Sequence, residues 1–170
     1  MAPFVRRTWS PCGKTPWLYQ KTRSHKKVSV IAALCIAPCR SHLRLFFRLH
    51  PDANINAHLV AAFLKNLLKE LTGPILIVWD RSVPHRSKKV QALWNNNPRL
   101  QLSFLPPYAP ELNPVEYVWS YSKTNPLANA SEMNVPELAT RARRSVRSVQ
   151  KKPYLLRSFI RASGLPLRLI

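Results

Sequence analysis

The chain has 170 residues, and its 27 Lys and Arg against 7 Asp and Glu give a formal net charge of +20 at pH 7. Its length suits one domain, and with 46% hydrophobic residues it is too apolar for a disordered basic tail. No run approaches the roughly 18 uncharged apolar residues of a membrane-spanning helix, so we expect a cytoplasmic protein with no membrane partner. A charge this far from zero predicts a polyanionic partner, most commonly a nucleic acid.

The first part of the chain is expected to form one hairpin after an irregular start. Residues 1–25 make a basic lead-in that is rich in Pro and Trp, with a turn signal over 11–16. Two bounded apolar runs of strand length follow, at 28–36 and 43–49. Because only a short polar loop separates the two runs, they predict an antiparallel hairpin.

A helix and a buried strand are predicted next. Apolar residues recur with a 3.6-residue period over 59–71, Asn56 is a suitable N-cap, and Gly73 gives a stop signal. The continuous apolar run 75–79 is typical of a strand that is covered on both faces. That strand ends on Asp80, and a carboxylate at the end of a buried strand indicates a functional position.

A parallel crossover and a stiff connector lead to a second acidic residue. A helix over 85–96 and a strand over 100–105, coming after a buried strand, imply a parallel connection. A Pro-rich connector then ends at Asn113, where a helix begins with Pro at its first position and Glu116 at its third. Two interpretations of Glu116 stay open: the partner of Asn113 in a capping box, or a functional carboxylate.

The last part of the chain, residues 126–170, is predicted to be a basic helical tail. Over 135–150 a narrow apolar stripe leaves the remaining faces to arginines, with almost no compensating acids. A solvated helix face and a phosphate-binding face both fit this pattern, and the scarcity of acids favours phosphate. Together with cations that follow Asp80, the nucleic-acid-binding candidates are Arg81, Arg86, Lys88, Lys89, Arg141, Arg143, Arg144, Arg147, Lys151 and Lys152.

Asp80 and Glu116 are the residues that point to chemistry. They are 36 positions apart (116 − 80), and the intervening helix and strand can bring both carboxylates to the same edge of a sheet. Hard oxygen ligands in such a place suit Mg²⁺ or Mn²⁺, and these ions support phosphodiester chemistry. The two residues are therefore both catalytic and metal-ligand candidates.

Three stretches of this sequence resemble the mariner-related bacterial insertion-sequence transposases of the DDE superfamily. The similarity extends over roughly residues 5–125 and includes an Arg-Thr-Trp segment at residues 6–16. Its two long motifs are Trp79-Asp80-Arg81-Ser82-Val83-Pro84-His85-Arg86-Ser87 and Leu105-Pro106-Pro107-Tyr108-Ala109-Pro110-Glu111-Leu112-Asn113-Pro114-Val115-Glu116-Tyr117-Val118-Trp119.

The resemblance implies a ribonuclease H-like mixed sheet flanked by helices, with a partial DDE endonuclease core at 26–125. It implies that Asp80 is the second acidic metal ligand and Glu116 the third, that the cofactor is Mg²⁺ or Mn²⁺, and that the partner is DNA. His85 matches a motif histidine to which the sequence assigns no role. A DNA-bound protein of this kind would be nucleoid-associated.

The family's first catalytic Asp lies in a strand before the Arg-Thr-Trp segment, so we expect this chain to be N-terminally truncated. That strand is central in the sheet, between the hairpin and the strand at 75–79, and both neighbours should therefore lack a backbone partner. With two of the three ligands, the chain alone should be inactive unless a homodimer or an upstream transposase segment completes it. The alternative function is a non-catalytic DNA-binding remnant without sequence preference. An unrelated RNA-binding protein fits the composition but does not explain the two acidic motifs.

Overall fold

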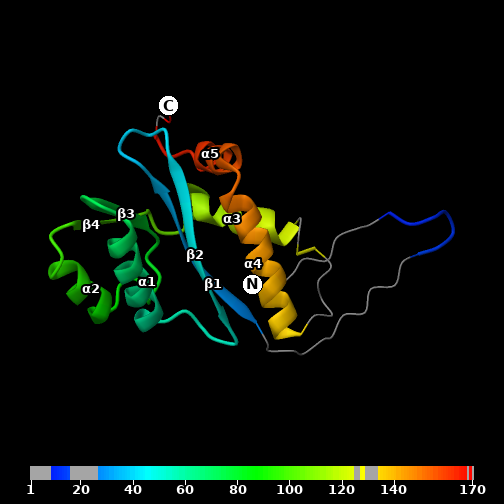
Figure 1. The fold of residues 1–170 in the computed structure, drawn as a ribbon, viewed down its shortest axis with the longest axis horizontal. Helices are drawn as coiled ribbons and strands as arrows, with labels where there is room; N and C mark the ends of the chain where they lie inside the picture. Colours follow the sequence, from blue (N-terminus) through cyan, green and yellow to red (C-terminus); the bar gives the residue numbers. More distant parts are fainter. Residues whose placement is uncertain (1–8, 16–26, 125–126, 129–133, 168, 170) are drawn as a thin grey trace.

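The structure, a computed structural model, describes residues 9–15, 27–124, 127–128, 134–167 and 169. Strands and helices combine in an α/β arrangement, as the sequence predicts (Figure 1). In chain order they are β1 (Val28–Ile36), β2 (Leu43–Pro51), α1 (Ala57–Glu70), β3 (Ile75–Trp79), α2 (Lys88–Asn95), β4 (Leu100–Phe104), the short 3₁₀ helix η1 (Pro110–Leu112), α3 (Pro114–Thr124), α4 (Val135–Gln150) and α5 (Pro153–Ala162).

The predicted hairpin is confirmed. β1 and β2 are antiparallel over nine residues each, from the pair of Val28 with Pro51 to the pair of Ile36 with Leu43. The turn predicted in the lead-in is also present, since the Lys14 amide donates to the Pro11 carbonyl at 3.0 Å. The remainder of the lead-in, residues 1–8 and 16–25, lies outside the described residues.

Helices cover both faces of the hairpin (Figure 1). On one face, alternate residues of β1 such as Ile31 and Ala33 pack against the cluster that α1 forms with β3 and α2. On the other face, Leu45 of β2 is buried among side chains of α3, α4 and α5. The hairpin is thus the middle of three layers, because the period-2 alternation of its strands gives each face its own apolar set.

Helix α1 begins where the sequence predicts. The Asn56 side chain caps it by accepting from the Leu59 amide at 3.1 Å, and Gly73 (φ +76°) lies in the left-handed region just beyond its end. The buried positions follow one helical stripe: Val60, Ala61, Phe63, Leu64 and Leu67. This stripe is the largest contribution of a single helix to the cluster beneath the hairpin.

Strands β3 and β4 form the predicted parallel pair, from Ile75 with Leu100 to Trp79 with Phe104. The crossover helix α2 is shorter than predicted, because residues 82–85 form a turn and the helix begins only after Ser87, which caps it. Its start therefore differs from the predicted start at His85.

The expectation that β3 is covered on both faces is wrong. Leu76 is 62% exposed and Val78 47% exposed, while Trp79 is buried. Among the described residues, β3 pairs only with β4 and β1 only with β2, so there are two separate two-stranded sheets. Each of β1 and β3 has an edge without a backbone partner, as expected for a sheet that lacks a strand between them.

The helices of the basic tail pack onto the hairpin. The apolar stripe predicted in α4 is buried, and Val146 and Val149 lie with Leu156 and Phe159 of α5 against β2. The sequence reading did not separate α5 from α4, although Pro153 at the first turn marks its start. None of the described helices has the length and apolar character that a membrane span requires.

Candidate active site

Asp80 is held in place by its own loop. Directly after β3, its Oδ1 accepts the Ser82 amide at 2.9 Å and lies 2.7 Å from His85 Nδ1. The His85 ring stacks on the Trp79 indole with centroids 4.3 Å apart and an interplanar angle of 7°. A buried aromatic of the strand thus fixes the histidine, and the histidine fixes one oxygen of the carboxylate.

These contacts decide the ionisation of Asp80. Partial burial raises its pKa, but the hydrogen bonds from Ser82 together with the charge and hydrogen bond of His85 outweigh burial, so the pKa is lowered. Asp80 is therefore a carboxylate at neutral pH. The Ser82 amide and His85 Nδ1 both contact Oδ1, so one oxygen of the carboxylate is oriented by the loop and by the histidine.

The capping-box interpretation of Glu116 is wrong. Asn113 does cap α3, accepting the Val115 amide at 3.1 Å. In a capping box the Asn113 amide would donate to Glu116, but it donates to the Pro110 carbonyl at 3.0 Å. The Glu116 side chain is therefore free of that structural role.

Glu116 lies close enough to Asp80 for their charges to interact. Burial raises the pKa of Glu116, the nearby Lys123 lowers it, and the negative charge of Asp80 raises it, with a net upward shift. Both carboxylates line one cavity of about 550 Å³. The structure thus brings together two acidic residues that are 36 positions apart in the sequence (116 − 80).

The rest of the cavity wall is basic or Pro-rich. Arg81 and Arg86 line it, and Arg81 is anchored by the Leu105 carbonyl at 3.4 Å and by the Phe104 ring at 5.8 Å. On the opposite side Tyr108 is fully exposed and has a left-handed backbone (φ +57°). A ring held outward at the rim of a cavity with two arginines can reach a bound polyanion.

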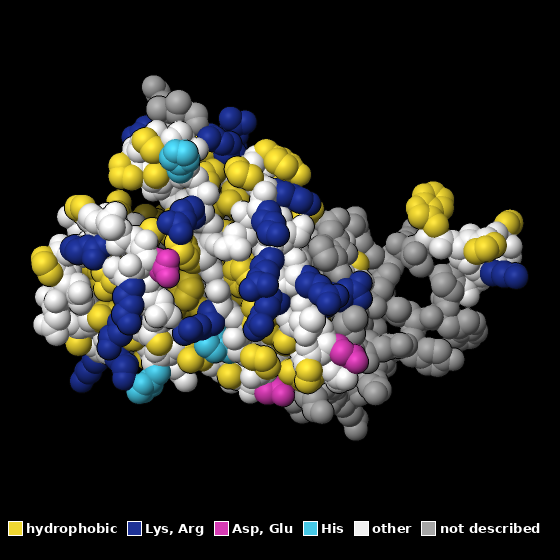
Figure 2. All heavy atoms as spheres, viewed as in Figure 1, with side chains coloured by type: hydrophobic (Ala, Val, Ile, Leu, Met, Phe, Trp, Pro, Cys, Tyr) yellow, Lys and Arg dark blue, Asp and Glu magenta, His cyan; other side chains and the backbone are white. Residues whose placement is uncertain are grey.

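The other predicted basic residues lie away from this cavity. Lys88 and Lys89 are exposed at the start of α2, and Lys89 Nζ lies 2.8 Å from His58 Nδ1. Arg141, Arg143, Arg144 and Arg147 lie on α4, and Lys151 and Lys152 join α4 to α5. Figure 2 shows Lys and Arg side chains over several elements of one face, with few acidic side chains among them.

Sequence reasoning missed two residues. Arg48 and His50 of β2 line a second cavity together with Arg143 and Arg147 of α4. The signal was present, because polar side chains alternate with apolar ones along β2 and must face the side opposite to Leu45 and Leu49.

The donor set at Asp80 and Glu116 fits a hard divalent cation in its chemistry. Both ligands are carboxylates, and a cation between them would offset the repulsion that raises the pKa of Glu116. The described residues contain no group of three or more His, Cys, Asp and Glu side chains arranged to hold a metal. Among the described residues, the two carboxylates therefore do not form a complete metal site by themselves.

Known proteins similar to this chain point to one family. The DDE superfamily endonuclease profile matches residues 2–139. A curated relative, the uncharacterized protein y4pE/y4sA of Sinorhizobium fredii, is 41% identical over 56 residues, which is 29% of this chain and 42% of the relative. The chain thus matches less than half of that relative's length.

Solved structures agree on the fold. The Mos1 mariner paired end complex with Mn has a TM-score of 0.56 at 16% identity, covering 99% of this chain and 53% of the Mos1 chain. The Mos1 strand transfer complex has a TM-score of 0.53 at 17% identity, covering 98% and 52%. This chain therefore spans about half the length of the Mos1 chains, and its fold is the predicted ribonuclease H-like one. With the match extending over most of its length, the chain belongs to the DDE superfamily endonuclease family.

Proposed function

We propose that this chain is part of a mariner-type transposase, binds DNA, and supplies two carboxylates of a metal-dependent centre for strand cleavage and transfer. The observation that carries the proposal is the meeting of Asp80 and Glu116 in one cavity whose wall includes Arg81 and Arg86. Carboxylates beside guanidinium groups suit a phosphodiester, because the arginines bind the phosphate while the carboxylates hold a cation.

Each residue has a distinct task in this proposal. His85 and Ser82 hold the Asp80 carboxylate, which would bind the cation, and Glu116 would supply the second carboxylate. Arg81 and Arg86 would orient the phosphate. When bound, Mg²⁺ or Mn²⁺ would stabilise the charge that develops on the attacking and leaving oxygens.

A third carboxylate is proposed to arrive on a strand between β1 and β3. Both strands contribute to the cluster around α1 and each has an unpaired edge, so an extended segment can pair with either. A segment parallel to β3 would end at the Asp80 side of the sheet and would place its last residue there. In the part of the chain that the structure describes, all four strands are already paired within the fold, so we propose that an upstream transposase segment rather than a homodimer supplies the additional strand.

Nicking of supercoiled DNA in Mn²⁺ tests the proposal. The chain alone should bind DNA without nicking it. Adding a nine-residue apolar, β-branched peptide that ends in Asp should restore nicking, and the same peptide ending in Asn should not. Asp80→Asn and Glu116→Gln should each abolish the restored activity, which excludes a contaminating nuclease.

Two results would overturn parts of this proposal. Nicking by the chain alone that depends on both Asp80 and Glu116 would show that no third strand is needed. No nicking with either peptide, from a chain that binds the plasmid, would favour the alternative function, a DNA-binding protein without catalysis. The net charge of +20 favours that alternative independently of the carboxylates. Both functions predict association with the nucleoid.

A further inference from the structure

A second cavity, of about 620 Å³, lies between β2 and α4, and three of its lining residues are arginines. We propose that this cavity, the β2–α4 groove, binds the sugar–phosphate backbone of DNA at a place separate from the two carboxylates. Its polar lining consists of Arg48, His50, Arg143, Arg147 and Gln150. The proposal rests on the proposed function only in taking DNA as the polyanion.

The groove has three guanidinium groups and no acidic lining residue. Arg143 and Arg147 are one helical turn apart on α4, so their side chains project from the same side of the helix. Arg48 comes from β2. Arg48, Arg143 and Arg147 are all exposed, so their charges are available to a ligand.

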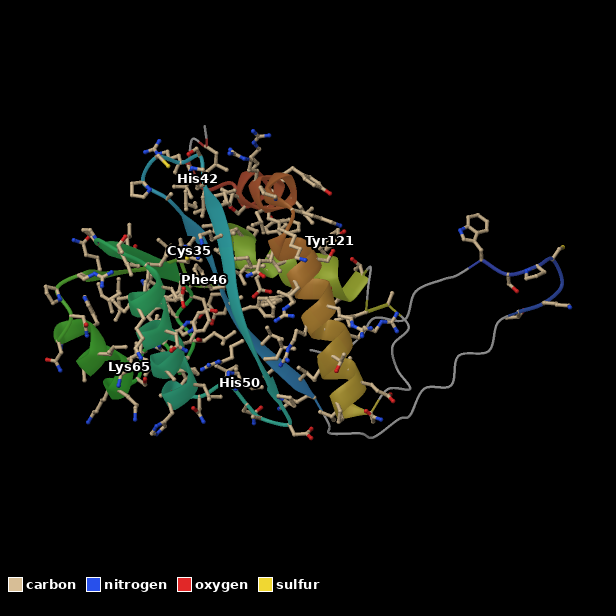
Figure 3. All side chains as sticks on the ribbon, in the orientation of Figure 1. Cys35, His42, Phe46, His50, Lys65 and Tyr121 are labelled. Carbon is tan, nitrogen blue, oxygen red and sulfur yellow. The ribbon has the colours of Figure 1, made fainter. Side chains whose placement is uncertain are left out.

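His50 is a lining residue of the groove and carries no positive charge there. Its Nε2 is buried and has no hydrogen-bond partner in the described structure. Burial and the charge of Arg48 both lower the pKa of His50, so the ring is neutral at pH 7 and the positive charge of the groove comes from its arginines. Figure 3 shows His50 and Phe46 on β2, on the side of the strand toward α1.

The open edge of β2 supplies backbone groups to the same groove. The Leu45 carbonyl turns away from β1, since it accepts the Gln150 side-chain amide at 2.6 Å. In an antiparallel pair alternate residues direct their peptide groups to the same edge, so Phe47 and Leu49 do so as well. Their amides lie where α4 and β2 run beside each other (Figure 1).

Nucleic acid fits these features better than an acidic peptide does. A peptide that extended the sheet would need the Leu45 carbonyl, which Gln150 already occupies. Phosphate oxygens need only donors, and the groove offers guanidinium and amide groups. The DNA backbone would thus lie along β2 and α4.

Salt-dependent binding of a duplex without sequence preference tests the groove. The full chain is titrated into a fluorescent 30-base-pair DNA, and anisotropy is followed at several salt concentrations. In Arg143→Gln/Arg147→Gln, the slope of log K against log salt should become shallower by about 2, since each phosphate contact contributes about 0.9. At 0.1 M salt this corresponds to roughly a 50-fold loss of affinity.

The matched control is Lys65→Gln/Lys69→Gln, which removes the same charge from two exposed positions one turn apart on α1. Its affinity should fall by less than about threefold, because distant charges are screened. Equal slopes for the two double variants would overturn the proposal. If Arg143→Gln/Arg147→Gln loses binding to poly-glutamate but keeps DNA affinity, the groove takes an acidic peptide and the proposal is wrong.

The test separates this inference from the proposed function. Asp80→Asn should lose the peptide-restored nicking while keeping the wild-type salt slope. If Arg143→Gln/Arg147→Gln binds DNA normally and nicking is intact, the proposed function is supported and the proposed DNA-binding role of the groove is wrong. If the groove variant has a shallower salt slope but the wild-type chain does not nick DNA with the Asp-ending peptide, the groove binds DNA and the proposed cleavage function is wrong.

Discussion

The two sheets of this molecule differ in how completely they are covered. The hairpin of β1 and β2 is nine residues long and has helices on both faces, with Leu45 buried at its centre. The β3–β4 pair is five residues long, and Leu76 and Val78 leave part of one face bare. The carboxylates of the candidate active site lie at the end of the less covered sheet.

The two sheets differ in the kind of contact that holds the residues around them in place. Apolar packing from three helices holds the hairpin and α4, and these elements carry the basic groove. The end of β3 relies more on polar contacts, because the Ser82 amide and His85 hold Asp80, and Arg99 ties β4 to α1. The proposed DNA-binding groove therefore lies on a well-packed part of the fold, whereas the proposed cutting site depends on the proposed additional strand.

The sharpest test of this comparison is to truncate one leucine in each sheet. Leu45→Ala removes a buried side chain and should lower the free energy of unfolding by about 2–5 kcal/mol, the transfer and cavity cost of such a change. Leu76→Ala should change it by less than about 0.5 kcal/mol, because the side chain is already in water. Urea unfolding followed by circular dichroism measures both. Equal losses would show that the two sheets are covered alike.

Removing Arg99 should have a smaller effect that is confined to the β3–β4 region. Its guanidinium donates to the Gly73 carbonyl at 2.9 Å, to the Leu68 carbonyl at 3.2 Å and to the Leu71 carbonyl. Arg99→Gln would leave partly buried carbonyls unpaired and should cost about 1–3 kcal/mol. Hydrogen exchange should show faster opening of the end of α1 than of β2.

The control for Arg99 is Arg161→Gln, which changes an exposed arginine in the last turn of α5. It should stay within about 0.5 kcal/mol of the wild type. If the two variants unfold at the same urea concentration, the carbonyl contacts of Arg99 do not stabilise the smaller sheet.

The sequence predicted what local chemistry decides and missed what depends on distant neighbours. Apolar periodicity and caps placed the hairpin and α1, and the motif spacing identified Asp80 and Glu116. The bare face of β3 could not be predicted, because a continuous apolar run looks the same whether or not its neighbour is present. Likewise, the stacking of His85 on Trp79 depends on the turn that delays α2, which helical periodicity does not show.

The smallest expected effect is a pH-dependent gain in stability when Glu116 is neutralised. Its pKa is raised in the folded chain, so the protonated form is favoured by folding, and that contribution is lost as the pH rises through the raised value. Glu116→Gln is neutral at every pH. It should match the wild type near pH 3 and be more stable at pH 7, by less than about 0.5 kcal/mol, because the side chain is only half-buried and solvent screens its charge.

Thermal unfolding at pH 3 and at pH 7 measures this difference, with Glu111→Gln on η1 as a control that changes an exposed carboxyl near the same cavity. The control should behave alike at both pH values. A Glu116→Gln chain that is less stable than the wild type at pH 7 would mean that Glu116 contributes to folding. In that case the Glu116 carboxylate at the start of α3 would stabilise the fold, and the candidate active site would not be separate from the parts of the molecule that hold the structure together.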